Sequence, residues 1–590
     1  MNSMKKALIT RVVYVVIMAV GVSCAYVSLK NKNGAIVYAH DTMTEIASTI
    51  DSGHLSSAAG DYVKQDQSTE QKRVLSQNDQ QLDIQQSGAQ VSAQGWRMVQ
   101  EQAKNTVVQI ISHIAAIDLL RPYRAPTEGT GSGSGFFIKD EGGKYYIVTN
   151  AHVVDQAKAI WLQIPSFGKR IFDVDMDKVS ISPDRDLALL QLRPELLALI
   201  EQKLGTIPFL PLGNSDTVLR SDEVLALGYP LGQQSLKSTN GIVSGREYNM
   251  IQMSNAINPG SSGGALLNTR GEVIGISTAG IVEAQNIGYA IAVNDLKIVL
   301  PDMKKTRIVR KPFLGVLFNN ASVALTEFLG NPAPGGCYVV EVVKGSTLEK
   351  AGVKQGDMIY AINGFDIDIF GDMCVPWCED KISLIEYVSR LSIGESINLV
   401  VYRSGERKEF SVKFDHAELP AIRKIYPGYD AIDYEIFAGM VIMPLTLNHV
   451  QLIGPQAPGL AHFTEMRNTT KPTLVITHMF RDSQVFRDRI TGVGFTVHEV
   501  NGMPVGTLDD FRKAVKKGMG NKFFTMLVSD NVNRTTDRVF LSLSMKQILE
   551  EEPRLSVAYC YPITQHTKEL LSIAQAQNML AVSQQARTTA

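Results

Sequence analysis

The sequence predicts a multidomain globular protein in which an all-β domain precedes two smaller units of mixed α+β structure. Its 590 residues correspond to roughly three to four domains of ordinary size. Between about residues 104 and 305, short β-branched runs are separated by Gly, Pro, Asn and Asp, a pattern typical of an all-β barrel or sandwich. Beyond that region, two segments repeat one pattern: an apolar run, a loop, and a strand that ends in Asn-Gly.

The composition excludes several classes of protein. Lys and Arg total 58 and Asp and Glu total 59, which gives a net charge of -1. A general nucleic-acid binder carries a basic excess, so we expect no nucleic-acid partner. Five cysteines in a chain of this length cannot form a disulfide framework, and a hydrophobic content of 44% is ordinary for a soluble protein. Any function must therefore be inferred from motifs.

The first forty residues have the form of a targeting segment. Lys5, Lys6 and Arg11 precede an uncharged, mostly apolar run from Val12 to Leu29, and a basic segment before an apolar core is typical of an export signal. The run is also close to the roughly 20 residues that span a bilayer, so an uncleaved membrane anchor is an open alternative. We expect an exported protein, periplasmic or membrane-anchored and facing outside the cytoplasm.

The chain divides into segments of different composition. A polar, Gln-rich stretch after the apolar run predicts a flexible spacer, and HAELPAIRKIYPGYD predicts a linker between the two mixed units. The predicted segments are an export signal or membrane anchor at 1–40, a Gln-rich spacer at 41–103, the all-β domain at 104–305, the first mixed unit at 308–415, a linker at 416–433, the second mixed unit at 434–550 and a C-terminal tail at 551–590.

Short apolar runs within the all-β region have the character of strands. A helical stretch from Val293 to Lys305 is predicted to close the region. The predicted strands are Gly135 to Ile138, Tyr145 to Thr149, Ala159 to Ile164, Leu187 to Leu192, Val224 to Leu227 and Val273 to Ile276.

The two mixed units have the pattern of a diverged tandem repeat. The first contains YVVEVVKGSTLEKAGVKQGDMIYAINGF and the second LVITHMFRDSQVFRDRITGVGFTVHEVNGM. Aligning the two segments places Asn363-Gly364 and Asn501-Gly502 at equivalent positions. We therefore expect the two units to share one fold.

Three local features of the all-β region together supply the groups for nucleophilic catalysis. YYIVTNAHVVD places His152 just after a strand, SPDRDLALLQL places Asp186 where a strand begins, and NAINPGSSGGALLN places Ser262 inside a Gly-rich turn. Each feature alone is more often structural than catalytic. Together they supply a base, an orienting acid and a nucleophile in the order used by chymotrypsin-like enzymes.

The chemistry explains why these residue types are needed. A Ser hydroxyl is a poor nucleophile at neutral pH, so His152 is predicted to take the proton of Ser262 and later protonate the leaving amine. Asp186 is predicted to bond the other ring nitrogen, and Asp184 is the competing acid. The developing oxyanion needs backbone N–H donors. The predicted oxyanion hole comprises Gly260, Ser261 and Ser262.

These motifs resemble a known family. TNAHVV, DLALL and NPGSSGGALLN resemble the triad motifs of the Deg/HtrA family of serine endopeptidases, and RKPFLGV with GSTLEKAGVKQGDMIYAING resembles the PDZ domain that follows the protease in that family. DYEIFAGMVIMPL and the strand after it look more like the divergent second PDZ domain of the plant-type Deg branch. The resemblance covers about residues 104–550. It implies a chymotrypsin-like double β-barrel followed by two PDZ-type domains.

The resemblance also implies an activity and partners. It implies an endopeptidase for unfolded or damaged proteins that assembles as a trimer-based homo-oligomer and can switch between inactive and active loop arrangements. The sequence contains no phosphate loop, cofactor fingerprint or metal-ligand set, so we expect the enzyme to need no ATP, cofactor or metal. The sequence departs from the usual Gly-Asn-Ser-Gly-Gly at Ser261. An alternative from another class is a proteolytically idle chaperone or peptide-binding scaffold, although all three triad residues are present.

The specificity pocket is predicted beside and after the nucleophile. No Asp or Glu lies in the matching stretches, so we expect a small or medium aliphatic side chain before the scissile bond. The residues predicted to line this pocket are Ala256, Ile257, Thr278 and Ala279.

A peptide-binding loop is predicted in the first mixed unit. Phe313, Leu314, Gly315 and Val316 match the PDZ carboxylate-binding loop, whose N–H groups receive a peptide C-terminus while the peptide adds as a strand to the sheet edge. In the second unit, the stretch from Phe437 to Met440 is a poor copy. A structural or assembly role is equally supported for that unit.

Two cysteines of the first mixed unit stand close together in CVPWC. Cys374 and Cys378 have no further Cys or His cluster beside them, which makes a zinc site a poor fit. A local disulfide and two structural thiols both stay open.

Overall fold

The computed structural model describes residues 29–30, 36–37, 95–278, 287–311, 314–332, 335–414, 419–533 and 538–588. The chain forms two compact units, Met1–Glu101 and Gln102–Ala590. In the first, β1 (Leu29–Lys30) pairs antiparallel with β2 (Ile36–Val37). The rest of the predicted export signal, and the Gln-rich spacer as far as residue 94, lie outside the described residues. Among the described helices, none is long and apolar enough to cross a membrane.

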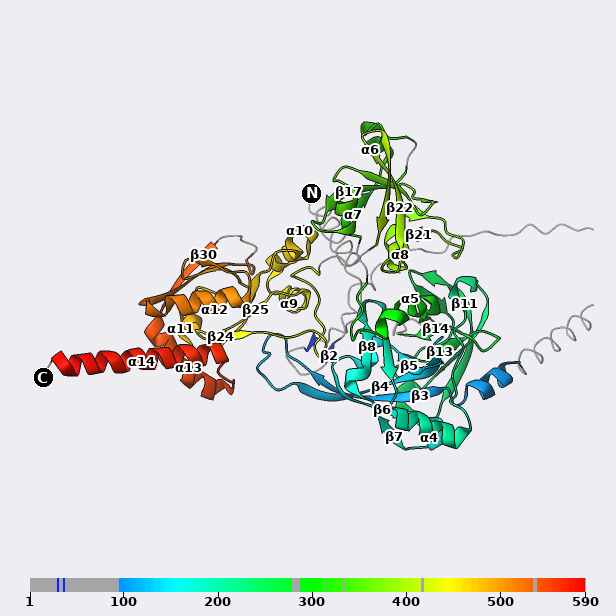
Figure 1. Ribbon diagram of the computed structural model, residues 1–590, viewed down its shortest axis with the longest axis horizontal. Coiled ribbons are helices and arrows are strands. Elements are labelled where there is room, and N and C mark those ends of the chain that lie inside the picture. The colour runs from blue at the N-terminus through cyan, green and yellow to red at the C-terminus, as the bar shows by residue number, and fades with distance from the viewer. Residues whose placement is uncertain are drawn as a thin grey trace, which may run out of the picture. The chain divides into compact units, whose positions relative to one another are not determined.

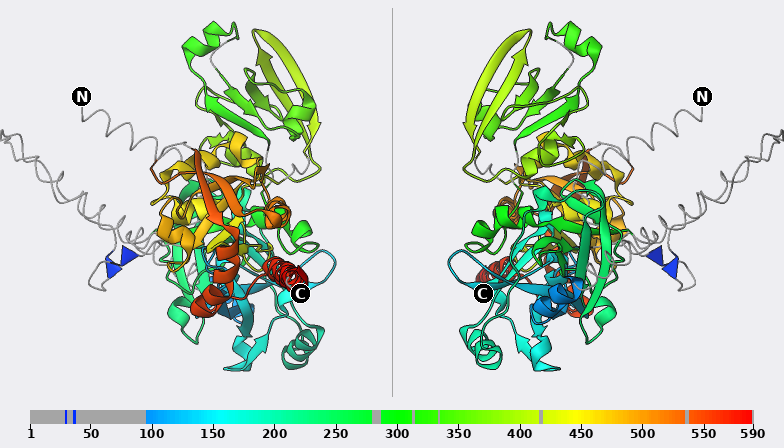
Figure 2. Two further views of the ribbon diagram at one scale, coloured as in Figure 1. Left: turned by 90° about the vertical axis from the view of Figure 1, so that its left-hand side faces the viewer. Right: turned by 90° about the vertical axis from the view of Figure 1, so that its right-hand side faces the viewer.

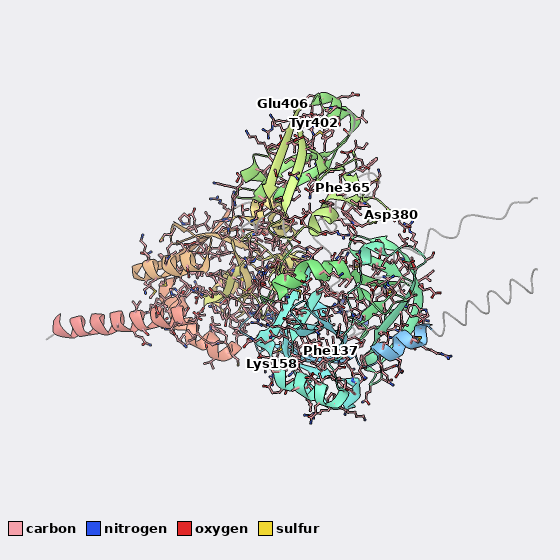
Figure 3. All side chains as sticks on the ribbon, turned by 45° about the vertical axis from the view of Figure 1, so that its right-hand side comes forward. Phe137, Lys158, Phe365, Asp380, Tyr402 and Glu406 are labelled. Atoms are coloured by element: carbon pink, nitrogen blue, oxygen red, sulfur yellow. The ribbon has the colours of Figure 1, made fainter. Side chains whose placement is uncertain are left out.

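The first half of the all-β domain is a seven-stranded antiparallel sheet in the order β7-β6-β3-β4-β5-β9-β8. Its longest hairpin joins β3 to β4, and β4 buries three consecutive side chains including Phe137, which is labelled in Figure 3. Along the chain, helix α3 (Ala151–Val154) lies between β5 and β6, and helix α4 (Pro194–Leu204) follows β9. The strands are β3 (Val107–Ala116), β4 (Thr127–Lys139), β5 (Tyr145–Thr149), β6 (Ala157–Gln163), β7 (Ile171–Asp173), β8 (Val179–Ser182) and β9 (Leu187–Gln191).

The second half is a closed six-stranded barrel in the order β10-β11-β12-β15-β14-β13. Its core consists of aliphatic and Met side chains that point inward from the strands, as the alternation of β-strand side chains requires. Helix α5 (Val293–Met303) follows the last strand and lies beside β14 (Figure 1). The strands are β10 (Glu223–Gly228), β11 (Lys237–Glu247), β12 (Met250–Met253), β13 (Ala265–Leu267), β14 (Val273–Ser277) and β15 (Gly288–Ala292).

The first mixed unit contains a sheet in the order β16-β17-β18-β22-β23, with β19 paired to β18. The β22–β23 hairpin is a long twisted ribbon (Figure 2), and Tyr402 and Glu406 mark its turn in Figure 3. Its elements are β16 (Val316–Asn320), α6 (Val323–Phe328), β17 (Cys337–Val342), α7 (Thr347–Ala351), β18 (Met358–Ile362), β19 (Phe365–Asp366), β20 (Asp372–Met373), β21 (Ile382–Ser383), α8 (Leu384–Ser389), β22 (Ser396–Arg403) and β23 (Glu406–Lys413).

The second mixed unit contains a sheet in the order β24-β25-β26-β27-β29-β30, with β28 paired to β27. Helices α13 and α14 follow this sheet, and α14 is the long red helix of Figure 1. Its elements are β24 (Glu435–Phe437), β25 (Met440–Pro444), α9 (Leu447–Ile453), α10 (Met466–Thr469), β26 (Leu474–Met479), α11 (Gln484–Asp488), β27 (Thr496–Val500), β28 (Met503–Pro504), α12 (Leu508–Lys517), β29 (Phe523–Ser529), β30 (Arg538–Ser544), α13 (Met545–Tyr559) and α14 (Gln565–Thr588).

The two mixed units share an internal backbone plan. Asn363 and Asn501 both have positive φ, 50° and 49°, and each begins a tight turn between two paired strands. The Asn363 side chain accepts a hydrogen bond from the N–H of Asn398, and the Asn501 side chain accepts one from the N–H of Thr525. The equivalence predicted from the two Asn-Gly pairs therefore has a structural counterpart.

The second unit extends beyond the boundary predicted at residue 550. Helix α13 continues through Pro553 to Tyr559, and its Leu555 packs with Tyr561 against the sheet. Leu570 of α14 lies in the same core as α12. The predicted tail after residue 550 is therefore part of this unit's packed structure at least to α14.

The segment predicted as a linker is packed rather than open. Tyr426 is buried in the hydrophobic core of the first sheet, together with Val153 of α3. Arg310 donates from Nη2 to both carboxylate oxygens of Asp430, at 2.9 and 2.7 Å. Both side chains of this pair are largely buried. The described part of the segment, 419–433, is therefore packed on the all-β domain.

Candidate active site

His152 and Asp186 are brought together from two strands of the first sheet. His152 lies in the short helix α3 after β5, and Asp186 immediately precedes β9. His152 Nδ1 lies 2.8 Å from Asp186 Oδ2 and 3.0 Å from Oδ1, and the His152 backbone N–H donates to Oδ1 at 2.9 Å. The carboxylate therefore fixes both the backbone and the ring of His152. This arrangement leaves Nε2 as the nitrogen that can accept a proton.

The backbone of Asp186 is unusual. Its φ of 53° and ψ of 42° lie in the left-handed region, where a side chain is disfavoured by about 1 kcal/mol or more. The side chain of Asn150 donates to the Asp186 carbonyl at 2.9 Å. Thr278 Oγ1 donates to Asp186 Oδ2 at 2.9 Å, so both carboxylate oxygens accept hydrogen bonds. The left-handed turn directs the carboxylate toward His152.

The geometry also distinguishes Asp186 from the competing acid. The carboxylate of Asp184 accepts from the Lys311 N–H at 3.1 Å and from the Tyr426 hydroxyl at 3.4 Å. It therefore contacts the segments that leave the all-β domain. Asp186 is the carboxylate paired with His152.

Ser262 lies in a turn whose backbone is fixed by the surrounding strands. The Ser134 N–H donates to the Ser262 carbonyl at 2.8 Å, and the Gly263 N–H donates to Ser277 at 2.8 Å. Gly263 has a φ of 85°, and a Cβ at this position would lie 2.1 Å from Ser134 O and 2.2 Å from Thr149 Oγ1. Only glycine fits there, so the turn holds Ser262 with its side chain largely buried.

The turn leaves two of the three predicted oxyanion donors available. The Gly260 and Ser262 N–H groups donate no hydrogen bond to any described residue. The Ser261 N–H donates to the Asn258 carbonyl at 2.9 Å. The prediction that Ser261 contributes a donor is therefore wrong in this arrangement, because its N–H closes the turn.

Ser262 and His152 are not joined by a hydrogen bond in the described structure, although both side chains lie within it. Such contacts are often long in proteins without substrate and tighten only in the reacting complex. The His152–Asp186 pair is formed, while the contact between nucleophile and base is open.

Opposing effects act on the pKa of His152. Partial burial of the ring lowers the pKa, but the hydrogen bond and negative charge of Asp186, with a further contribution from Asp155, raise it. The net pKa lies above the ordinary value of 6.5. A base with a raised pKa accepts a proton more readily, which suits a group that must become an imidazolium during reaction.

A cavity of about 160 Å³ lies behind the oxyanion turn. Ala256 and Ile257, which were predicted to line the specificity pocket, line this cavity together with Ser261 and Ser277. The prediction for Thr278 is wrong, because its hydroxyl bonds Asp186 rather than facing the cavity. Ala279 lies outside the described residues. The lining contains no carboxylate, and Lys237 is its one charged residue within the described structure.

The predicted carboxylate-binding loop leads into the edge strand of the first mixed unit. Gly315 has a φ of 82°, and Leu314 and Val316 on either side are buried. A Cβ on Gly315 would lie 2.0 Å from Ser346 Cβ. Phe313 lies outside the described residues. The described part of the loop thus has the glycine turn that precedes an open strand edge.

Sequence reasoning missed some groups that support these sites. Thr278 was assigned to the pocket although it bonds Asp186, and Asn150 was not singled out. Asn150 stands two residues before His152 in TNAHVV, so its position was a usable signal. Cys374 and Cys378 are not bonded to each other in this structure; Cys374 is exposed and Cys378 is partly buried.

Parts of this chain match known protein families. Residues 133–276 match the trypsin-like peptidase domain, and residues 312–414 match the PDZ domain. Serine protease Do-like HtrA of Bacillus subtilis is 30% identical over 49% of this chain and 64% of its own length. A probable periplasmic serine endoprotease DegP-like of Hahella chejuensis is 31% identical over 51% and 60%. Putative serine protease HhoA of Synechocystis is 31% identical over 48% of this chain and 70% of its own length.

This chain belongs to the HtrA family of serine proteases. It spans less than two thirds of the length of the first two relatives, and the match lies in the protease and first PDZ domains. A solved structure titled HtrA-type protease AlgW with decapeptide is 25% identical, covers 55% of this chain and 98% of that one, and has a TM-score of 0.41. The match over residues 312–414 identifies the first mixed unit as the PDZ domain of this HtrA-family chain.

Proposed function

We propose that this chain is a serine endopeptidase in which His152, Asp186 and Ser262 act as a triad. The observation that carries the proposal is the bidentate contact of Asp186 with His152, at 2.8 and 3.0 Å, beside a glycine turn that presents Ser262. The residues are those that acyl transfer to water requires.

Each group has a defined role in the proposed reaction. His152 Nε2 takes the proton of Ser262 Oγ as that oxygen attacks the scissile carbonyl, and it returns the proton to the leaving amine. Asp186 keeps the ring oriented and stabilises the imidazolium, while Thr278 holds the carboxylate by donating to Oδ2. The N–H groups of Gly260 and Ser262 receive the oxyanion. Water then attacks the acyl-enzyme carbonyl while His152 takes its proton; the ester bond to Ser262 Oγ breaks, His152 returns the proton to that oxygen, and the carboxylic acid product leaves.

The proposed substrates are unfolded or damaged proteins of the compartment to which the chain is exported. Relatives named periplasmic serine endoproteases support export, and the PDZ domain supports capture of peptide C-termini at the open edge of β16. We also propose that the chain assembles from trimers and that it prefers an aliphatic side chain before the scissile bond. The proposed boundaries are 104–305 for the protease domain and 308–415 for the PDZ domain.

Cleavage of unfolded casein tests the proposal. The wild-type chain should degrade it, and Ser262→Ala should reduce the rate about a millionfold, because loss of the nucleophile removes the whole triad mechanism. Thr217→Ala, a surface hydroxyl of the same domain, is the matched control and should keep the wild-type rate. Equal and negligible cleavage by wild type and Ser262→Ala, with both suppressing aggregation, would favour an idle chaperone instead.

The pH dependence gives a second measurement. The His152 pKa is raised, so the ring is protonated and unable to act as a base until the pH exceeds a value above 6.5. We expect kcat/KM to fall on the acid side with a midpoint above 6.5. A midpoint below 6.5 would contradict the assignment of His152 as the base held by Asp186.

A further inference from the structure

Arg185 is a buried cation directly before Asp186. It ends the short turn that leads into β9, and its side chain is almost fully buried. Its Nη2 donates to the Ser389 carbonyl at 2.6 Å. Ser389 is the last residue of α8 in the PDZ domain. One hydrogen bond therefore joins the residue before the catalytic acid to a PDZ helix distant in sequence.

This placement is costly for an arginine. Its Nε and Nη1 have no hydrogen-bond partner in the described structure. Burial lowers the pKa of Arg185, while the charges of Asp295 and Asp184 oppose that effect without bonding it. Burying a guanidinium with so few partners destabilises a fold. The contact with Ser389 is therefore better explained by the positioning of the Arg185 backbone than by a gain in folding stability.

The geometry at stake is the left-handed backbone of Asp186. A strained conformation persists only where its surroundings fix it. Asn150 holds the carbonyl of Asp186 on one side, and the anchored side chain of Arg185 holds the preceding residue on the other. The acceptor is itself fixed, because Arg390 donates from Nη2 to both carboxylate oxygens of Asp216, at 2.7 and 2.8 Å.

We propose that Arg185 is a positioning residue that holds Asp186 in its catalytic conformation by tying the preceding turn to the C-terminal end of α8. The proposal rests on the proposed triad. It gives the PDZ domain a second role, in which the end of its helix α8 supports the catalytic acid of the protease domain.

Substitutions in the full-length chain test this role. Arg185→Met keeps the apolar stem and removes all donors, whereas Arg185→Lys keeps a positively charged donor group at the end of a similar stem. We expect Arg185→Met to lower kcat about 10- to 100-fold, the range for a small misplacement of catalytic groups, with KM changed less than about twofold. Arg185→Lys should recover most of that loss.

A matched control breaks a different contact between the same two domains. Arg220 pairs with Asp380 of the PDZ domain, labelled in Figure 3, and both side chains are exposed. Arg220→Met should keep the wild-type kcat and KM. An equal loss in Arg220→Met would overturn the proposal, because domain docking in general would then be responsible.

A spectroscopic readout separates this proposal from the proposed activity. The proton shared by His152 Nδ1 and Asp186 gives a downfield NMR resonance, which can be followed in a Ser262→Ala background. It should persist with Arg220→Met and disappear or broaden with Arg185→Met. Retention of this resonance and of kcat in Arg185→Met would overturn the proposal. If Ser262→Ala did not abolish cleavage, the proposed activity would be contradicted, whereas the proposed role of Arg185 would still be tested by the resonance.

One further variant covers the case in which Arg185→Met does not fold. Arg390→Met frees the end of α8 from Asp216 without altering Arg185. It should lower kcat and weaken the same resonance by a smaller factor. Wild-type kcat and resonance in a folded Arg390→Met chain would overturn the proposal.

Discussion

The PDZ domain and the second mixed unit begin with the same glycine turn and use it differently. A Cβ on Gly315 would lie 2.0 Å from Ser346 Cβ, and one on Gly439 would lie 2.2 Å from Ser483 Cβ. In the PDZ domain, the turn leads into β16 at the end of its sheet. In the second unit, Ala438-Gly439 closes a hairpin, and β24 pairs with β25 from Phe437↔Met440 to Glu435↔Ile442. The chain itself thus occupies the edge where a peptide would add.

Buried ion pairs reinforce this difference. In the PDZ domain, Arg403 donates to the fully buried Asp357 and joins β22 to the turn before β18. In the second unit, Arg512 of α12 donates to the fully buried Glu435 of β24 at 2.8 Å, and Thr567 of α14 donates to Glu435 as well. The second pair anchors the strand that fills the edge. One turn therefore serves an open edge in the first case and a closed one in the second.

The largest expected effect comes from removing that anchor. Glu435→Ala removes the buried acceptor of Arg512, Thr564 and Thr567, while Arg512 keeps its pair with Asp433. It should destabilise the second unit by about 3 kcal/mol or more, because each hydrogen bond to a charged group contributes about 1.5 to 3 kcal/mol. It should also release β24, so that the amides of β25 exchange hydrogen faster. Urea unfolding and hydrogen exchange measure both effects.

Asp357→Asn is the matched control for this substitution. It should destabilise the PDZ domain comparably while β25 stays protected. Slow exchange of the β25 amides in Glu435→Ala would show that β24 stays paired with β25 without the Glu435–Arg512 ion pair. That result would contradict the role of the pair in closing the sheet edge.

The second effect in size depends on pH. Glu552 of α13 is buried beside Tyr561, whose hydroxyl donates to it at 2.8 Å, and burial raises its pKa to about 7 from 4.5. A carboxyl with a raised pKa gives stability that is complete below pH 4.5 and is lost as the pH rises through 7. The second unit should therefore lose roughly 3 kcal/mol over that range.

Glu552→Gln should flatten this pH dependence, because glutamine stays neutral and can still accept from Tyr561. Chemical unfolding of the second unit at pH 5 and pH 8 measures the difference. An unchanged slope with pH in Glu552→Gln would assign the dependence to other groups.

The smallest effects on stability separate the two glycine turns. Gly315→Ala and Gly439→Ala should each destabilise their own unit by about 1 to 3 kcal/mol, because both add a Cβ at positive φ against a serine. Only Gly315→Ala should weaken binding of a peptide with a free C-terminal carboxylate, by about tenfold or more. Fluorescence anisotropy with free and amidated peptides measures this, and equal weakening by both substitutions would contradict a closed edge in the second unit.

Local sequence patterns were sufficient to predict many of the strands and the three residues of the candidate site. The runs at Tyr145 to Thr149 and Val273 to Ile276 became β5 and β14, because β-branched residues between turn formers specify strands locally. His152, Asp186 and Ser262 each lie in a motif with its own flanking pattern, so each was recognisable without knowledge of the packing.

The features that escaped prediction depend on contacts between distant segments. Nothing near Thr278 in the sequence indicates Asp186, which is 92 residues away. A tail was predicted from residue 551, but packing of Leu555 and Tyr561 overrides the helix-breaking tendency of Pro553 in α13. The stretch from Phe437 to Met440 was compared with a carboxylate-binding loop, but Ala438-Gly439 closes the β24–β25 hairpin. The contacts that hold β24 join Glu435 to Arg512 and Thr567, which are far away in the sequence.

The packing of Tyr426 affects how the molecule can be divided. This side chain is part of the core that contains α3, and Asp430 is paired with Arg310. The segment 419–433 should therefore exchange its amide hydrogens in step with the protease domain. A fragment that ends at residue 415 would leave a hole in that core. The protease domain, as a cooperative folding unit, therefore includes a piece of chain that follows the PDZ domain in sequence.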